Sequence, residues 1–143
     1  MTCEDSLLHK WCAARDAGDL EALDRYLHVD VTGHAPGGVE TTDLEQERET
    51  WRLVKAAMPG IRHKIQEVVS MGSTIAARIV VTGTLRGKFA GISADGRSFR
   101  VDQAVFAHTR DGKVSEFWAI LDTGHFLQQM GAIPGGLAEP PSA

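Results

Sequence analysis

Three polar residues carry the chemistry that this sequence can do: His34, Gln103 and Asp122. His34 opens the glycine- and proline-rich segment 34–38, where a neutral imidazole can act as a base or as a hydrogen-bond donor. Gln103 is the one polar side chain on the apolar face of a predicted strand, and a lone amide among apolar walls is typical of a site that orients a carbonyl or a phenol. Asp122 adds a carboxylate at the end of another strand. We expect these three residues to be catalytic and to move protons on an apolar substrate.

Each of the three also has a purely structural explanation. His34 can be an exposed loop histidine. Gln103 can be a core amide whose hydrogen bonds go to the backbone. Asp122 stands just before Gly124 and a short predicted helix, where an aspartate commonly serves as the N-cap. Both explanations stay open for every one of them.

The motifs of other catalytic classes are absent from the sequence. It has no His-Glu-x-x-His and no Cys-x-x-Cys, and its six histidines are scattered, so no metal ligands are predicted. Glycine motifs that hold phosphates are missing, as is the Gly-x-Ser-x-Gly turn of serine hydrolases. Acid–base chemistry without a cofactor, or binding alone, remains.

Helical periodicity in the first sixty residues predicts the elements that must position these groups. A first helix covers 5–17 and a second covers 19–27. The polar segment 28–41 is predicted as a loop. A capping-box pattern at 42–45 then opens a third helix, which ends before Pro59.

Beyond residue 60, β-branched residues and tight turns predict strands. The first hairpin turns at Gly72-Ser73 and would set Glu67 opposite Arg78. Helices followed by an antiparallel meander give the α+β class. We expect a curved antiparallel β-sheet wrapped around the N-terminal helices, forming a cone-shaped barrel with an apolar pocket. The predicted strands are 62–71, 74–84, 98–109 and 113–122, and a short helix follows at 124–130.

The register of the second hairpin, which turns at 111–112, decides which side chains face the pocket. A two-residue loop would pair Thr109 with Val114, whereas a three-residue loop with a glycine bulge would pair Gln103 with Ala119. We expect the bulge. One face of the hairpin is then mostly apolar and should line the pocket. The predicted pocket walls are Trp51, Met58, Phe89, Val105, Phe117 and Ala119.

Composition excludes several classes of protein. The chain has 143 residues, 43% hydrophobic and 24% charged, which predicts one folded domain over 1–133 and a flexible C-terminal tail over 134–143. A net charge of −4 argues against nucleic acid as a partner. No apolar run approaches the ~18 residues of a membrane span, and no signal peptide is recognisable. Cys3 and Cys12 lie too far apart on one predicted helix for a disulfide, so free thiols and a cytoplasmic location are expected.

A series of short motifs then points to a family. They are Ala17-Gly18-Asp19, Met58-Pro59, Ala77-Arg78 before Gly83-Thr84, Gly87-Lys88-Phe89-Ala90-Gly91-Ile92, Asp111-Gly112-Lys113-Val114 with Trp118, and Asp122 before Leu127-Gln128-Gln129-Met130-Gly131. In this order, over about residues 5–134, the sequence resembles the SnoaL-like polyketide cyclase family. The resemblance implies the cone fold of nuclear transport factor-like proteins.

The resemblance also implies an activity. Family members include cofactor-free enzymes of antibiotic biosynthesis, which close a ring on an aromatic polyketide ester by an intramolecular aldol step. In the ring-closing members an acid/base aspartate follows the tryptophan, whereas here the triplet is Phe117-Trp118-Ala119. A methyl group cannot take a proton, and such a loss costs roughly 10²–10⁴-fold in rate. The alternatives are a cofactor-free hydroxylase, an epoxide-hydrolase-like enzyme and a non-catalytic ligand-binding protein.

The opposite face of the last two predicted strands carries a charged cluster and an aromatic residue that bear on catalysis and on subunit contacts. The expected register sets Arg100 opposite Asp122, with Asp102 diagonal to both, which resembles the water-activating set of limonene epoxide hydrolase but also suits a surface ion-pair cluster. Trp118 on this face is predicted at a subunit contact, because aromatic residues concentrate in interface cores. We therefore expect a homodimer or higher homo-oligomer that takes a small aromatic or apolar substrate and binds neither nucleic acid nor membrane.

Overall fold

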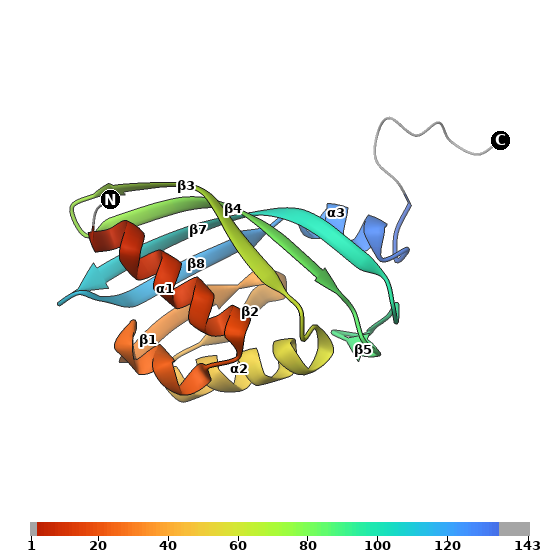
Figure 1. The fold of residues 1–143 in the computed structure, drawn as a ribbon, viewed down its shortest axis with the longest axis horizontal. Coiled ribbons are helices and arrows are strands. Elements are labelled where there is room, and N and C mark those ends of the chain that lie inside the picture. The colour runs from red at the N-terminus through yellow and green to blue at the C-terminus, as the bar shows by residue number, and fades with distance from the viewer. Residues whose placement is uncertain (1–2, 135–143) are drawn as a thin grey trace.

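Helices and a long β-meander follow one another as the periodicity predicts (Figure 1). The computed structural model describes the backbone of residues 3–134 and the side chains of residues 7–134. In chain order the elements are α1 (Cys3–Ala17), a 3-10 helix (Leu20–Arg25), β1 (Leu27–Ala35), a 3-10 turn (Pro36–Gly38), β2 (Val39–Thr41), α2 (Leu44–Ala57), β3 (Arg62–Met71), β4 (Thr74–Thr84), β5 (Lys88–Phe89), β6 (Ile92–Ser93), β7 (Ser98–Arg110), β8 (Lys113–Leu121) and α3 (Thr123–Gln129).

Six of the strands form one curved sheet in the order β2-β1-β8-β7-β4-β3. Every neighbouring pair is antiparallel except β1 and β8, which run parallel. The sheet curves around α1 and α2, which lie on its concave side (Figure 1). The α+β prediction is confirmed, and so is the cross-strand pair of Glu67 with Arg78, whose side chains form an ion pair of 2.9 Å. The sheet does not close into a barrel, because β2 and β3 are its two edges among the described residues.

The segment predicted as a loop at 28–41 is instead mostly strand. Its first part is β1, in which Leu27 and Val31 are buried, and β2 pairs back onto the end of β1. The glycine and polar residues of this segment gave no strand pattern in the sequence. The strand forms because β1 pairs in parallel with β8, about 85 residues further along the chain. The predicted helix 19–27 is likewise wrong in its length and type, because a 3-10 helix covers only Leu20–Arg25 before β1 begins.

Helix α2 begins one residue later than the capping-box pattern predicts. The N-cap is Asp43, whose side chain accepts a hydrogen bond from the backbone N–H of Gln46 at 2.8 Å. The Gln46 side chain accepts in turn from the backbone N–H of Thr42, also at 2.8 Å. Asp43 and Gln46 therefore take the places of Thr42 and Glu45 in the cap, and the Gln46 side chain binds the N–H one residue before the N-cap.

The register of the β7–β8 hairpin differs from the expected one. Thr109 pairs with Val114 through a two-residue turn, and the bulge lies one step later, at Ser115. Gln103 therefore pairs with Leu121 and not with Ala119, a shift of two residues. A shift of two leaves every side chain on its predicted face, because side chains alternate with a period of two along a strand.

Apolar side chains from α1, α2 and the concave face of the sheet form one hydrophobic core within the described residues. Trp11 of α1 and Phe117 of β8 meet there edge to face, with ring centroids 5.0 Å apart.

Cys12 is a buried free thiol, and burial raises its pKa. The side chain of Cys3 and the predicted tail beyond Pro134 lie outside the described residues, and the domain boundaries and the cytoplasmic location stay predictions. None of the described helices is long and apolar enough to cross a membrane.

At Gly33 the backbone of β1 lies close to the side chains of Thr41 and Phe117, and this residue provides a test of the packing. A Cβ atom there would lie 2.5 Å from Thr41 Oγ1 and 2.6 Å from Phe117 Cζ. We expect Gly33→Ala to lower the free energy of unfolding by about 1–3 kcal/mol, because the added methyl overpacks the core. Gly60→Ala is the control, since a Cβ at that residue meets nothing within 4 Å. The free energy of unfolding of both variants is measured by urea denaturation. An equal loss in the two variants would contradict the close packing at Gly33.

Candidate active site

A partly open cavity of about 200 Å³ lies between the two helices and the concave face of the sheet. Its walls are mainly apolar and aromatic, as is typical of a small-molecule site. Of the residues predicted to form the site, six line this cavity: Trp51, Met58, Phe89, Gln103, Phe117 and Ala119. Val105 shares their face of the sheet but does not line the cavity; it is buried in the adjacent core.

Among the polar residues of the cavity wall, His63 of β3 is held by Asp16 from the last turn of α1. The Asp16 carboxylate contacts His63 twice: one oxygen lies 2.6 Å from Nδ1 and the other accepts the backbone N–H at 2.7 Å. The imidazole is 3% exposed and packs edge-on against Trp51. Its second nitrogen, Nε2, makes no hydrogen bond to any residue that the structure describes.

Burial lowers the pKa of His63 below its ordinary value of 6.5, and the nearby charges of Arg15 and Lys55 act in the same direction. The hydrogen bond and the charge of Asp16 oppose this shift without reversing it. At neutral pH the ring is therefore uncharged, with the Nδ1 proton donated to Asp16 and a lone pair on Nε2. Such a pair, a base oriented by a carboxylate, is an arrangement suited to general-base catalysis.

Arg15 contributes a buried positive charge to the cavity wall. The side chain lies between the rings of Trp11 and Trp51, with its Cζ 4.7 and 4.5 Å from their centroids. One terminal nitrogen donates to Cys12 Sγ at 3.3 Å, whereas Nε is buried without a hydrogen-bond partner. No carboxylate with a described side chain forms an ion pair with it. The stacking orients the guanidinium and leaves part of its hydrogen-bonding capacity unused.

Gln103 on β7 extends into the same cavity. Its Oε1 atom is buried and accepts no hydrogen bond. The structural explanation in which the backbone satisfies this amide is therefore wrong for its oxygen. A buried polar atom without a partner costs roughly 1–3 kcal/mol, so it is rare in folded proteins and calls for a functional explanation.

Glu47 is the one acidic residue in the cavity lining, and it is 3% exposed. The hydroxyl of Thr41 donates a hydrogen bond of 2.7 Å to its carboxylate. This contact joins α2 to β2 beside the cavity.

His34 does not lie in the cavity. It belongs to strand β1, where it stacks on Trp118 on the convex face of the sheet, with ring centroids 5.1 Å apart. Its ring nitrogens contact Glu116 at 2.9 Å and Glu40 at 2.5 Å. The hydrogen bond that the ring donates to the Glu116 carboxylate is the main cause of a pKa of His34 raised above 6.5, and Glu40 adds to it. The expectation that His34 lies in a loop is wrong, because residue 34 belongs to strand β1 and its side chain points outward.

Asp122 is likewise outside the cavity and acts as the N-cap of α3, where it accepts the backbone N–H of His125 at 3.2 Å. The expected Arg100–Asp122 juxtaposition is also absent, because the two-residue shift brings Asp122 beside Asp102. Arg100 instead exchanges backbone hydrogen bonds with the side chain of Gln129. The cluster that resembled an epoxide hydrolase site is therefore not assembled.

The sequence contains a signal for the polar residues that were missed. Arg15 continues the apolar stripe of Leu8 and Trp11 on α1, and Glu47 interrupts a similar stripe on α2. A charged residue at a core position of a helix is rarely accidental. His63 alternates with Arg62 and Lys64, so its inward direction follows from the strand period.

This cone, with helices inside a curved sheet and an apolar cavity between them, is the fold of nuclear transport factor-like proteins, and solved structures share it. The chain belongs to the SnoaL-like polyketide cyclase family, whose model matches residues 6–130. IdmH from Streptomyces antibioticus, described as a candidate polyketide cyclase, is 28% identical with a TM-score of 0.79, covering 92% of this chain and 99% of that one. TsrD from Streptomyces laurentii is 25% identical with a TM-score of 0.82, covering 92% and 96%. AclR from Streptomyces galilaeus, described as a candidate hydroxylase, is 21% identical with a TM-score of 0.79, covering 94% and 84%. Comparison with curated proteins gives no match.

The two histidines give opposite predictions for titration by NMR. We expect the pKa of His63 to lie below 6.5 because the ring is buried, and the pKa of His34 to lie above 6.5 because the ring is hydrogen-bonded to Glu116. Asp16→Asn should lower the pKa of His63 further, because it removes the carboxylate that favours the charged ring. Glu116→Gln should lower the pKa of His34 and leave His63 unchanged. A His63 pKa at or above 6.5 in the natural chain would contradict the described burial.

Proposed function

We propose that this protein is a cofactor-independent enzyme of aromatic polyketide or related natural-product biosynthesis that closes a ring through an enolate. One observation carries the proposal: an uncharged histidine, oriented by a carboxylate, borders an apolar cavity with its free nitrogen unpartnered. The relationship to polyketide cyclases supports the substrate class.

The proposed reaction begins with proton transfer. Nε2 of His63 takes a proton from the carbon next to a substrate carbonyl, and the imidazolium that forms is stabilised by Asp16. The negative charge then rests on the enolate oxygen, where the Arg15 guanidinium can stabilise it in surroundings that exclude water. The enolate carbon attacks a second carbonyl of the same molecule and forms the carbon–carbon bond. The resulting alkoxide takes the proton back from His63.

This arrangement accounts for Ala119. The methyl group of Ala119 lines the cavity from β8, whereas the His63–Asp16 pair approaches from β3 and α1. In this proposal the pair supplies the base that the family places beside the tryptophan. Gln103 offers Oε1 to a hydroxyl or phenol of the substrate and so fixes its orientation.

Proton abstraction can be tested without the natural substrate. Ethyl benzoylacetate exchanges its activated methylene protons in deuterium oxide, and NMR follows the protein-catalysed part of the rate. We expect His63→Gln to reduce that part about 10²–10⁴-fold and Asp16→Asn to reduce it by a smaller factor in the same range. His34→Gln is the matched control and should change the rate less than about twofold. A loss in the His34 variant, with none in the His63 variant, would restore His34 as the base.

The pH dependence follows from the direction of the shift. The protonated ring is inactive as a base, so the exchange rate should rise with pH through the lowered pKa of His63, below 6.5, and be level at neutral pH. Binding of the ester without catalysed exchange at any pH would favour the ligand-binding alternative.

We also propose that two copies of the chain pair through the convex face of the sheet. Phe106 and Ile120 on this face are 45% and 58% exposed, and the pairs of Phe106 with Trp118 and of Ala104 with Ile120 form a continuous apolar patch on β7 and β8. Exposed apolar patches of this kind mark interfaces. Sedimentation should show a dimer that Ile120→Glu weakens, whereas Lys64→Glu on β3, which β4 separates from β7 on the same face, should have less effect. A natural chain that sediments as a monomer at micromolar concentration would refute this arrangement.

A further inference from the structure

The cavity does not end at its mouth but continues into a surface groove between α2 and the β5–β6 hairpin. Four residues line both: Val39, Thr50, Val54 and Phe89. The groove has a volume of about 610 Å³ against about 200 Å³ for the cavity. An engineered cavity of ~150 Å³ holds one benzene, so the inner space accommodates one ring or two fused rings. A longer substrate must therefore place its remainder in the groove.

The floor of the groove is apolar and open to solvent. Leu53 of α2 is 59% exposed and Val39 is 45% exposed, and both line it. Exposed apolar side chains that continue the wall of a cavity are suited to an extended hydrocarbon segment that follows the ring out of the cavity.

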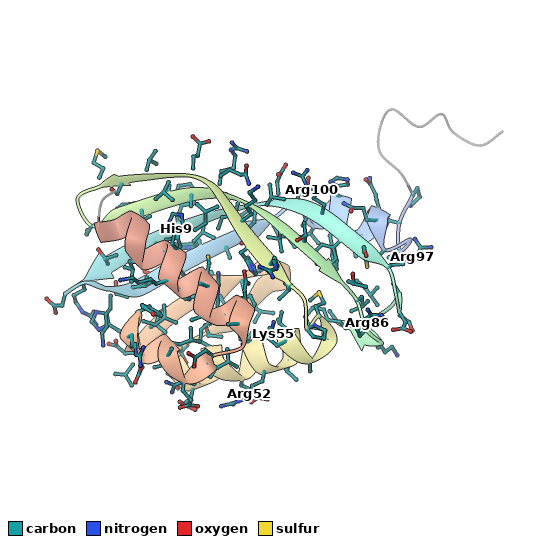
Figure 2. The ribbon with its side chains drawn as sticks, in the orientation of Figure 1. His9, Arg52, Lys55, Arg86, Arg97 and Arg100 are labelled. Atoms are coloured by element: carbon teal, nitrogen blue, oxygen red, sulfur yellow. The ribbon has the colours of Figure 1, made fainter. Side chains whose placement is uncertain are left out.

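Two cations border the same groove. Arg86 and Lys88 line it, and none of the described lining residues is acidic. Neither of their side chains forms a hydrogen bond or an ion pair with a described residue. Arg86 is positioned by its backbone N–H, which donates to the carbonyl of Ala57 at 2.7 Å, and Figure 2 shows it beside the C-terminal end of α2. The carboxylate of Asp95 accepts a hydrogen bond from the backbone N–H of Gly87, between the two cations in sequence, and forms no ion pair with either of them.

We propose that the groove binds the distal part of the substrate, an extended acyl segment that ends in an anionic group held by Arg86 and Lys88. This inference rests on the proposed function in placing the reacting ring in the cavity. It adds the substrate class: an amphipathic molecule with an aromatic head of one or two rings, an apolar linker and a carboxylate or phosphate at the far end. The net charge of the whole chain is −4, so local charge and not overall charge attracts the anion.

Binding of matched probes tests the proposal without turnover. The probes are ω-(2-naphthyl)alkanoic acids of increasing chain length and their uncharged primary amides, and their binding is measured by calorimetry at low and at physiological salt. We expect the longer acids to bind about three- to tenfold more tightly than their amides at low salt, because exposed ion pairs contribute modestly. The preference should fall at higher salt and be absent for the shortest acid, which cannot reach the cations.

Two sets of variants locate the effect. Arg86→Gln with Lys88→Gln should abolish the preference for the acid and leave the affinity of the amide unchanged. Lys64→Gln with Arg100→Gln removes the same charge from exposed positions outside the groove and should keep the preference. Leu53→Gln should weaken the long acid and the long amide equally. A phosphate-ended probe of matched length distinguishes the two anions.

The outcomes separate this inference from the proposed function. Three outcomes would overturn the proposal that the groove binds an anionic segment. They are equal binding of acid and amide, an equal preference in both double variants, and no binding of either probe. Loss of the preference in the Arg86/Lys88 variant together with unchanged exchange in His63→Gln would keep the groove and refute the catalytic base.

Discussion

The Asp16 carboxylate attaches the last turn of α1 to the first residues of β3, and the cavity depends on this attachment. It accepts from both the ring and the backbone of His63, at 2.6 and 2.7 Å. Lys55 of α2 donates to the backbone carbonyl of Asp16 at 2.6 Å, so that both helices meet at this point (Figure 2). Arg15 is the preceding residue on α1, and its place between two tryptophan rings requires the helix to be held in this position. Charge-assisted hydrogen bonds of this kind are stronger than neutral ones and can fix an element on a sheet.

The cavity contains polar atoms that a stable core would not keep. Gln103 Oε1 and Arg15 Nε are both buried without partners, and each such atom costs roughly 1–3 kcal/mol in a fold whose total stability is ~5–15 kcal/mol. Apolar residues of similar volume would remove that cost. Retaining these groups in fixed positions is how a site prepares hydrogen bonds for charge that develops during a reaction. The apolar walls strengthen those interactions because they exclude water.

The pleat of the sheet gives two histidines opposite properties. His63 faces inward, where burial favours the neutral ring, and His34 faces outward, where Glu116 and Glu40 favour the charged ring. The same side chain thus becomes a base in one place and a charged partner of acidic residues in the other. On the convex face His34 stacks on Trp118, and His108 packs edge-on against the same indole ring. The neutral histidine that can act as a base and the histidine paired with acidic residues therefore lie on opposite faces of one sheet.

The sequence by itself determined the class of fold, the helices α1 and α2, the long hairpins and the inward face of β7 and β8, because these follow from local periodicity and turn residues. Gln103 and five of the predicted walls were found in this way, and even a register error of two residues left their direction unchanged. Strand β1 was not found, and neither was the partnership of Asp16 with His63, 47 residues apart. Both depend on contacts between segments that are far apart in the sequence. Local patterns do not indicate which strands pair or which helix contacts a given strand. Only the tertiary structure could place His34 on the outer face and bring Asp16 to the inward-facing His63, because both outcomes depend on which elements pack side by side.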